Sequence, residues 1–171
     1  MLMCSGVVTC VCLSTLVACK PSQPSKNQLK TDIPITGAFG FTLGEKLPSE
    51  LELNDGYCFI NNYTDAPPFS TIQLACLPDR TIYTIIGHAY SNSSEVVAAL
   101  KSKYGPGEFY HTTNINAYNW TNGDGRLNAD KFGKYMDCIH VTYSSQSLQK
   151  RSFDELEKTS HATVTNLAPK L

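Results

Sequence analysis

The chain has 171 residues, which is enough for one domain of ordinary size but would leave two domains with little core each. Lys and Arg total 14 and Asp and Glu total 15, so the formal net charge is -1. Non-specific nucleic-acid binding depends on a strongly positive surface, so this balance excludes it as the default function, and we expect no nucleic-acid partner.

An apolar run of 13 residues, Gly6–Ala18, lies near the N terminus. It is well short of the ~20 residues that a helix needs to cross a bilayer, so we interpret residues 1–18 as a signal peptide. The run ends in Leu16-Val17-Ala18-Cys19, which resembles the lipobox of bacterial lipoproteins. This resemblance implies that the thiol of Cys19 receives a diacylglycerol, that a signal peptidase cleaves before it, and that the acylated chain is held in a lipid bilayer. An ordinary secretory signal or a buried apolar helix is the alternative, because the segment before the run carries no Lys or Arg.

Lys20 follows the cysteine, at a position where aspartate favours retention in the inner membrane of Gram-negative bacteria. The lipoprotein resemblance therefore implies an anchor in the outer membrane, with the protein facing the periplasm. Residues 19–32 are polar, contain two prolines and have no apolar period, so we predict a flexible tether. One folded domain is predicted over 33–148, followed by a C-terminal helix or tail over 149–171.

From Ile33 onward, short apolar and aromatic stretches alternate with Gly, Asn and Asp, a pattern typical of strands and turns. Most connections between the candidate strands are short, so we expect antiparallel pairing. In the last strand, the alternation predicts that Ile139, Val141 and Tyr143 face the core. The predicted strands are Phe39–Leu43, Tyr57–Asn61, Thr71–Cys76, Thr81–Tyr90, Ala117–Thr121, Arg126–Asp130 and Tyr135–Tyr143.

The clearest helix is predicted at about 92–105. Asn92 is its predicted N-terminal cap, with Glu95 reaching back, and Gly105-Pro106 ends it. A second, shorter helix is predicted from Ser152, where Ser152–Glu155 matches a capping box. The sequence therefore predicts an α+β fold in which a small antiparallel sheet is packed by one main helix. The predicted buried face of that helix consists of Val96, Leu100 and Tyr104.

Three of the seven cysteines lie in the predicted domain. Cys58 and Cys76 are symmetric about Pro67, in a turn-rich stretch between two candidate strands, so a hairpin folded there would place them opposite each other. We predict a disulfide between them in the oxidising periplasm, with two unpaired buried thiols as the alternative. Cys138 is then left over as a small buried side chain.

Sequence motifs for catalysis are missing: there is no nucleophile elbow, phosphate loop or zinc-protease motif, and the acidic residues are dispersed. We therefore predict no enzymatic activity and no cofactor. Cys138 and His140 share one side of a predicted strand, but no second pair at ligand spacing accompanies them, so we predict no metal site. The glycine-rich run 122–130 departs from a calcium loop in its glycine position and lacks the closing glutamate, which favours a hairpin turn.

Aromatic side chains flank the amide-rich loop 111–117. Such a combination is typical of surfaces that contact peptides or glycans, although aromatic residues also fill small β cores. The candidate ligand-binding residues are Tyr110, Tyr118 and Trp120.

Several segments, each of low specificity alone, together resemble small, uncharacterised secreted proteins and lipoproteins of Gram-negative bacteria: Gly40–Gly44, Lys103–Pro106, Trp120 and Val141–Tyr143. The resemblance implies a cell-envelope location and supplies no catalytic residues. The first functional hypothesis is a membrane-anchored, non-enzymatic periplasmic lipoprotein that binds a protein or a glycan. The alternatives are an immunity protein or inhibitor of a periplasm-acting toxin or lytic enzyme, and a small envelope hydrolase.

Overall fold

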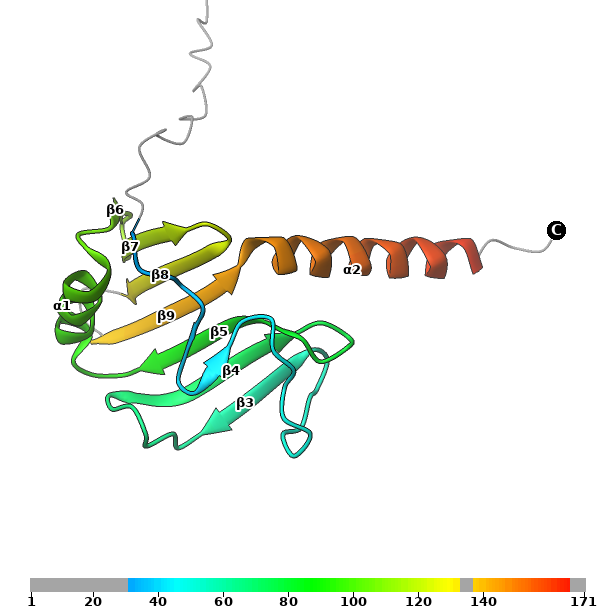
Figure 1. Ribbon diagram of the computed structural model, residues 1–171, viewed down its shortest axis with the longest axis horizontal. Helices are drawn as coiled ribbons and strands as arrows, with labels where there is room; N and C mark the ends of the chain where they lie inside the picture. Colours follow the sequence, from blue (N-terminus) through cyan, green and yellow to red (C-terminus); the bar gives the residue numbers. More distant parts are fainter. Residues whose placement is uncertain (1–30, 133–136, 167–171) are drawn as a thin grey trace, which may run out of the picture.

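The computed structural model describes residues 31–132 and 137–166, with side chains described through residue 158. Within these ranges, seven strands form one antiparallel sheet in the spatial order β3-β4-β5-β9-β8-β7-β6 (Figure 1). A separate two-stranded sheet consists of β1 and β2. The strands are β1 (Gly37–Ala38), β2 (Phe41–Thr42), β3 (Tyr57–Asn61), β4 (Phe69–Cys76), β5 (Ile82–Ala89), β6 (Glu108–His111), β7 (Ile115–Asn122), β8 (Gly125–Phe132) and β9 (Cys138–Ser145), and the helices are α1 (Ser93–Tyr104) and α2 (Gln146–Asn166).

The large sheet is built from two runs of neighbouring strands. β3, β4 and β5 follow one another across one half, and α1 then carries the chain from the centre of the sheet to its far edge. From that edge, β6, β7, β8 and β9 return step by step, so that β9 pairs with β5 at the centre. The short strands β3 and β6 form the two edges, an arrangement that limits unwanted pairing with other chains.

The predicted fold class is wrong. The described chain is mostly β, with seven strands in the large sheet, whereas we predicted a small sheet packed by one main helix. The prediction of α1 is confirmed, but α2 has 21 residues against 12 in α1 and begins at Gln146 instead of Ser152. The sequence missed β6 because its four residues are mostly exposed and do not alternate between polar and apolar side chains.

The N terminus of α1 is capped from a distant part of the chain. Asn92 lies in the left-handed region at φ 58° and makes no side-chain cap hydrogen bond, so its predicted role is wrong. Instead, the amides of Asn92 and Ser93 donate hydrogen bonds to the carboxylate of Asp137, at 2.7 and 2.9 Å. A carboxylate at this position satisfies free amides and complements the helix dipole. The contact thereby ties α1 to the beginning of β9.

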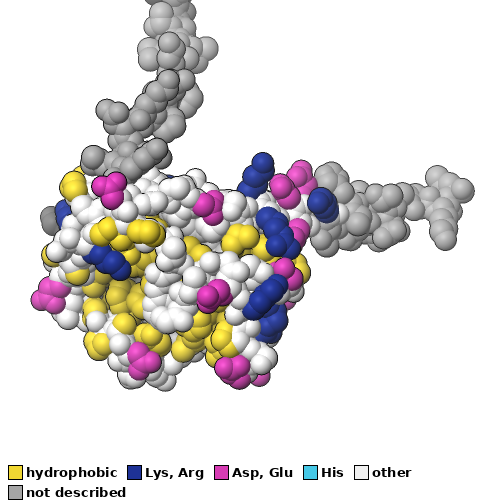
Figure 2. All heavy atoms as spheres, in the orientation of Figure 1, with side chains coloured by type: hydrophobic (Ala, Val, Ile, Leu, Met, Phe, Trp, Pro, Cys, Tyr) yellow, Lys and Arg dark blue, Asp and Glu magenta, His cyan; other side chains and the backbone are white. Residues whose placement is uncertain are grey.

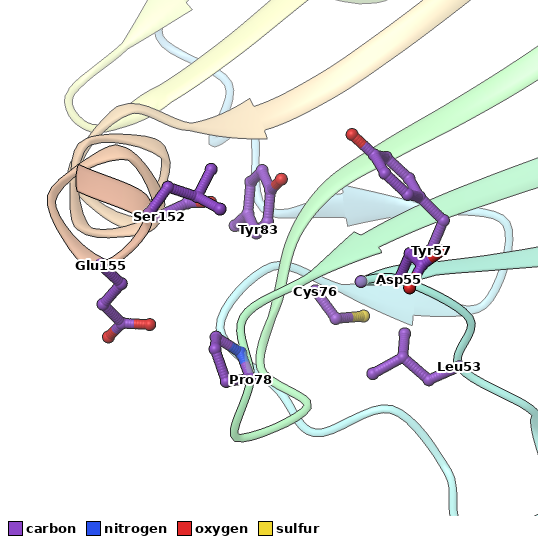
Figure 3. Close-up of a pocket in the computed structure, with 10 residues that line it drawn as sticks. Leu53, Asp55, Tyr57, Cys76, Pro78, Tyr83, Ser152 and Glu155 are labelled. Atoms are coloured by element: carbon purple, nitrogen blue, oxygen red, sulfur yellow. The ribbon is translucent and has the colours of Figure 1, made fainter. Parts of the chain in front are cut away.

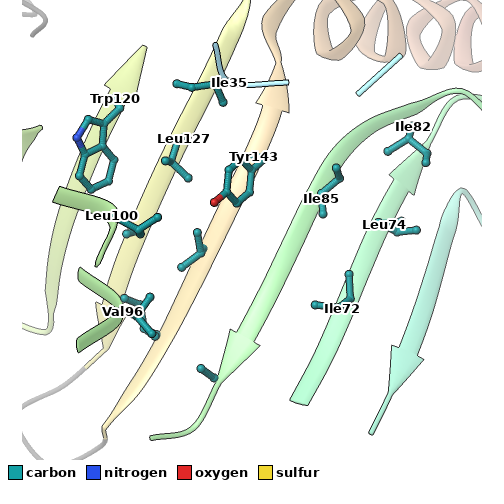
Figure 4. Close-up of a cluster of buried hydrophobic side chains, with 14 of the residues drawn as sticks. Ile35, Ile72, Leu74, Ile82, Ile85, Val96, Leu100, Trp120, Leu127 and Tyr143 are labelled. Atoms are coloured by element: carbon teal, nitrogen blue, oxygen red, sulfur yellow. The ribbon is translucent and has the colours of Figure 1, made fainter. Parts of the chain in front are cut away.

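The hydrophobic core lies on one face of the large sheet (Figure 4). The predicted inward side chains of β9, Ile139, Val141 and Tyr143, are buried there, as is the predicted face of α1. The segment 31–53, which includes β1 and β2, also covers this face. Phe39 packs directly on Gly87 of β5: a methyl group on Gly87 would come within 2.4 Å of the Phe39 ring.

Helix α2 follows β9 without a break and extends away from the sheet (Figure 1). Asp124, in the turn between β7 and β8, caps it by accepting a hydrogen bond from the Ser147 amide at 2.7 Å. Arg151 of α2 and Lys46 both form ion pairs with Asp79, and positive side chains gather near the base of the helix (Figure 2).

Neither described helix has the length and apolar character needed to cross a membrane.

Candidate functional site

Among the described residues, only the beginning of α2 reaches the face of the large sheet opposite the core, at one end, and we call this face the open face. Two rows of side chains cross it, because residues paired directly across neighbouring strands project on the same side of a sheet. The histidine row runs from β3 to β6 through Asn61, Thr71, His88, His140, Asp130, Ala117 and Tyr110. The amide row runs beside it through Phe59, Gln73, Ile86, Thr142, Asn128, Asn119 and Glu108.

Exposure distinguishes the two faces sharply. Each of these side chains is half-buried or exposed, whereas the intervening positions Ile72, Ile85 and Leu127 on the same strands are fully buried in the core. Helix α1 and the segment 31–53 pack on the core side of the sheet. Figure 2 views the molecule from this side, and no histidine of the described residues is visible in it. The described part of α2 reaches the sheet at one end of the open face, where the Gln149 side-chain amide donates to the Thr84 hydroxyl at 3.3 Å.

The composition of the two rows is polar but carries little charge. Among their members, only Asp130 and Glu108 are acidic, and none is Lys or Arg. Aromatic side chains stand at both edges of the sheet: Phe59 on β3 is 58% exposed, and Tyr110 on β6 is 44% exposed. The face therefore combines mainly polar groups on its inner strands, interrupted by Ile86 and Ala117, with exposed rings at its two ends.

The amide row has unused hydrogen-bonding capacity. The side chains of Gln73, Asn119 and Thr142 make no hydrogen bond with any residue that the structure describes, and Asn128 accepts one from Arg126 Nε at 3.3 Å. Each amide offers two N–H donors and a carbonyl acceptor, and the threonine hydroxyl offers one donor and two lone pairs. Strands hold these groups at fixed spacing, so a ligand that matches them would bind without ordering a loop.

The histidine row brings two imidazoles into contact at the centre of the sheet. The rings of His88 and His140 lie 4.3 Å apart at 76° to each other, and Phe132 packs 4.6 Å from His140. Burial lowers the pKa of both histidines, and the neighbouring His140 lowers that of His88 further. Burial also raises the pKa of the Asp130 carboxyl, against the opposing influence of His140 and Arg126. The imidazole pair is therefore neutral at neutral pH.

Within the described ranges, no three His, Cys, Asp or Glu side chains lie close enough together to hold a metal ion. The histidine pair and Asp130 are thus arranged as neighbours in a row and not as a closed ligand shell. Their chemistry at neutral pH is that of hydrogen-bonding groups.

The predicted ligand-binding residues do not form one site. Trp120 is 1% exposed on the core side, where its Nε1–H donates to the Gly105 carbonyl at 2.9 Å. Tyr118 projects on that same side and packs against Phe109 at 4.9 Å, whereas Tyr110 is paired with Ala117 and projects on the open face. Alternation along β6 and β7 sends these rings to opposite faces, so the structure does not bring Tyr110 together with Tyr118 and Trp120.

Sequence reasoning missed the residues that do come together on the open face. Gln73, His88, Asn119, Asn128 and His140 each lie between apolar residues of a strand. That alternation is the signal that could have found them, because it marks the side of each strand that faces away from the core. Their alignment across the sheet needs the register, which no single strand reveals.

The three cysteines of the domain are buried free thiols. Cys58 lies opposite Leu74, two residues from its expected partner Cys76. The expected register of this hairpin is therefore wrong, and the two cysteines are diagonal to each other. Burial, with a smaller influence of Cys58, raises the pKa of Cys76 to about 11, so this thiol is protonated at neutral pH. The predicted disulfide stays a prediction. Cys138 is buried, as expected, and Cys19 lies outside the described residues.

A separate apolar groove of about 450 Å³ lies between α2 and the end of the sheet (Figure 3). Ser152 and Glu155 line it from the helix, and Tyr57 and Leu53 line the opposite side. The Cys76 thiol also reaches the groove, but in its protonated form it is a poor nucleophile. The groove is therefore a hollow for apolar contact, without an assembled nucleophile and base among its lining residues.

Comparison of the chain with protein-family models, with curated proteins and with solved structures gave no match.

Proposed function

We propose that this protein is a lipid-anchored, non-enzymatic component of the bacterial cell envelope, and that it binds an envelope glycan through the open face. The observation that carries the binding proposal is the amide row, in which the side chains of Gln73, Asn119 and Thr142 are held on a sheet without a hydrogen-bond partner among the described residues. A glycan offers many hydroxyl groups that both donate and accept hydrogen bonds, which is the complement of these amides.

The chemistry of the open face favours a glycan over a protein partner. The centre of a protein–protein interface is typically apolar and rich in aromatic residues or arginine. Here the centre consists mainly of amides, hydroxyls and neutral imidazoles, with the apolar Ile86 and the acidic Asp130 among them. The exposed rings of Phe59 and Tyr110 stand at the ends. Aromatic faces provide apolar contact for the C–H faces of sugars. A glycan therefore uses both parts of this surface.

The location rests on the lipobox-like Leu16-Val17-Ala18-Cys19. In this proposal Cys19 carries the acyl chains, which hold the protein in the outer membrane on its periplasmic side. The polar tether 19–32, at ~3.1 Å per residue when extended, allows the domain to sit up to roughly 40 Å from the bilayer. That reach would let the open face contact glycans in the periplasm.

Two experiments test the two parts of the proposal. For the anchor, cells are labelled with a palmitate analogue, and we expect incorporation in the wild type and in Cys12→Ala but none in Cys19→Ala. Unchanged labelling of Cys19→Ala would rule out the anchor at this residue.

For binding, the purified wild-type chain is incubated with peptidoglycan sacculi and with immobilised polysaccharide extracted from envelopes. We expect retention on at least one of these glycans, and loss of retention in the double variant Asn119→Ala/Asn128→Ala. The matched control is Asn114→Ala, which removes an exposed asparagine from the β6–β7 connection and should bind as the wild type does. Retention on neither glycan would contradict the proposed binding function.

A further inference from the structure

The amide row has a direction and a length that restrict the shape of its ligand. Its members lie on all seven strands of the large sheet, one on each, from Phe59 on one edge to Glu108 on the other. Neighbouring strands are about 4.8 Å apart, so the row spans roughly 29 Å perpendicular to the strands. A ligand that uses the whole row must be an extended polymer.

Resting on the proposed function, we infer that the open face binds a single, uncharged glycan chain laid across the strands, with about one sugar for each strand. In an extended chain of β-linked pyranoses, the advance per sugar is close to the strand spacing of about 4.8 Å. Successive sugars would therefore meet successive side chains of the amide row. The histidine row, with its two neutral imidazoles, lies alongside and provides a second line of contacts.

The low charge of the face supports an uncharged ligand. Asp130 and Glu108 carry the only carboxylates in the two rows, and no Lys or Arg offsets them there. Arg126 lies next to Asn128 on the same side of β8, at the end of the face where α2 begins. A strongly anionic polymer would meet acidic groups without matching cations along the rows, so it fits this surface poorly.

The twist of the sheet adds a second restriction. Each strand is rotated by about 20–25° relative to its neighbour, so a row that crosses seven strands follows a twisted path. A single chain can follow this path by rotating about its glycosidic bonds, whereas the flat surface of a crystalline polysaccharide cannot. The face therefore selects individual soluble chains over packed ones.

Chain length is the measurement that distinguishes a row from a single pocket. The full-length protein is titrated calorimetrically with N-acetylglucosamine oligomers of increasing length. We expect the affinity to rise with each added sugar and to level off at about five to seven units, when the row is filled. A disaccharide that binds as tightly as the longer oligomers would overturn the inference. Failure of every oligomer to bind would also overturn the inference. The proposed function is tested separately, by retention of the protein on sacculi or on envelope polysaccharide.

Two variants far apart along the row test its direction. Gln73→Ala on β4 and Asn119→Ala on β7 remove amides that are four strand steps, or roughly 19 Å, apart. With a six-unit oligomer, each variant should lower the affinity roughly three- to tenfold, and the two effects should multiply in the double variant. A disaccharide cannot reach both positions, so at most one variant should lower its affinity. Asn114→Ala is the control and should leave both affinities unchanged.

Self-association is the competing use of an uncovered sheet face. Analytical ultracentrifugation of the wild type should give a monomer, and the two amide variants should not change the sedimentation. A dimer that dissociates when Gln73 or Asn119 is replaced would show that a second copy covers the face, and it would overturn the glycan assignment.

Discussion

Replacing Trp120 with phenylalanine tests whether this ring belongs to the core or to a ligand site. The side chain is 1% exposed and its Nε1–H donates to the Gly105 carbonyl at 2.9 Å. The ring also packs against Gly107, where an added methyl group would come within 2.6 Å of it. Phenylalanine keeps an aromatic ring at this position but loses the donor and part of the packed surface.

The expected loss of stability follows from these two contacts. Leaving the half-buried Gly105 carbonyl without its donor costs about 1–3 kcal/mol. The smaller ring buries ~40 Å² less apolar surface, which at roughly 25 cal/mol per Å² is about 1 kcal/mol. We therefore expect Trp120→Phe to lower the free energy of unfolding by about 2–4 kcal/mol.

Urea unfolding followed by far-ultraviolet circular dichroism measures this change, because the variant has lost the single tryptophan of the chain. The control is Phe109→Leu on neighbouring β6, whose ring is 53% exposed. A surface substitution of this kind should change the free energy by less than about 0.5 kcal/mol. If Trp120→Phe kept the stability of the wild type but lost glycan binding, the assignment of this residue to the core would be refuted.

Three further predictions concern the packing and the charges of the domain. Asp124→Ala removes the cap of α2 and should lower the free energy of unfolding by about 1 kcal/mol in urea titrations; a change near zero would contradict the capping role. Gly87→Ala forces the Phe39 ring away from β5 and should cost about 1–3 kcal/mol, seen as a lower melting temperature; an unchanged melting temperature would contradict this packing. Because the folded state lowers the pKa of His88 and His140 from 6.5, the unfolded chain binds protons first, and their contribution to stability should fall as the pH drops through about 6.5. Asp130, whose pKa is raised, acts in the opposite direction, so the test compares the wild type with His88→Gln/His140→Gln. The free energy of unfolding of the variant should depend less steeply on pH between 7 and 5, and an equal slope would contradict the assignment.

Local features of this fold were predictable because they depend on neighbours in the sequence. The strand Tyr57–Asn61 was predicted with its observed bounds, and α1 was placed within one residue at each end. The core-facing trio of β9 followed from simple alternation. In each case the pattern of apolar side chains within one element was sufficient.

Features that join distant segments were not predictable. Asp137 caps α1 from 44 residues beyond Ser93, and β5 pairs with β9 across the whole second half of the domain. The candidate site has the same origin, because His88 and His140 become neighbours only through that pairing. Trp120 illustrates the converse case. An aromatic residue beside an amide-rich loop suggested a ligand contact, and only its pairing with the buried Leu127 of β8 shows which face it occupies.

The side-chain amide signals of the protein in nuclear magnetic resonance spectra give the most direct test that the open face is the binding surface. On addition of an N-acetylglucosamine hexamer, the NH2 resonances of Gln73, Asn119 and Asn128 should shift together, while the indole N–H of Trp120 stays unchanged. Shifts confined to the groove beside α2, for example at Tyr83 and Ser152, would contradict the assignment and place the ligand elsewhere.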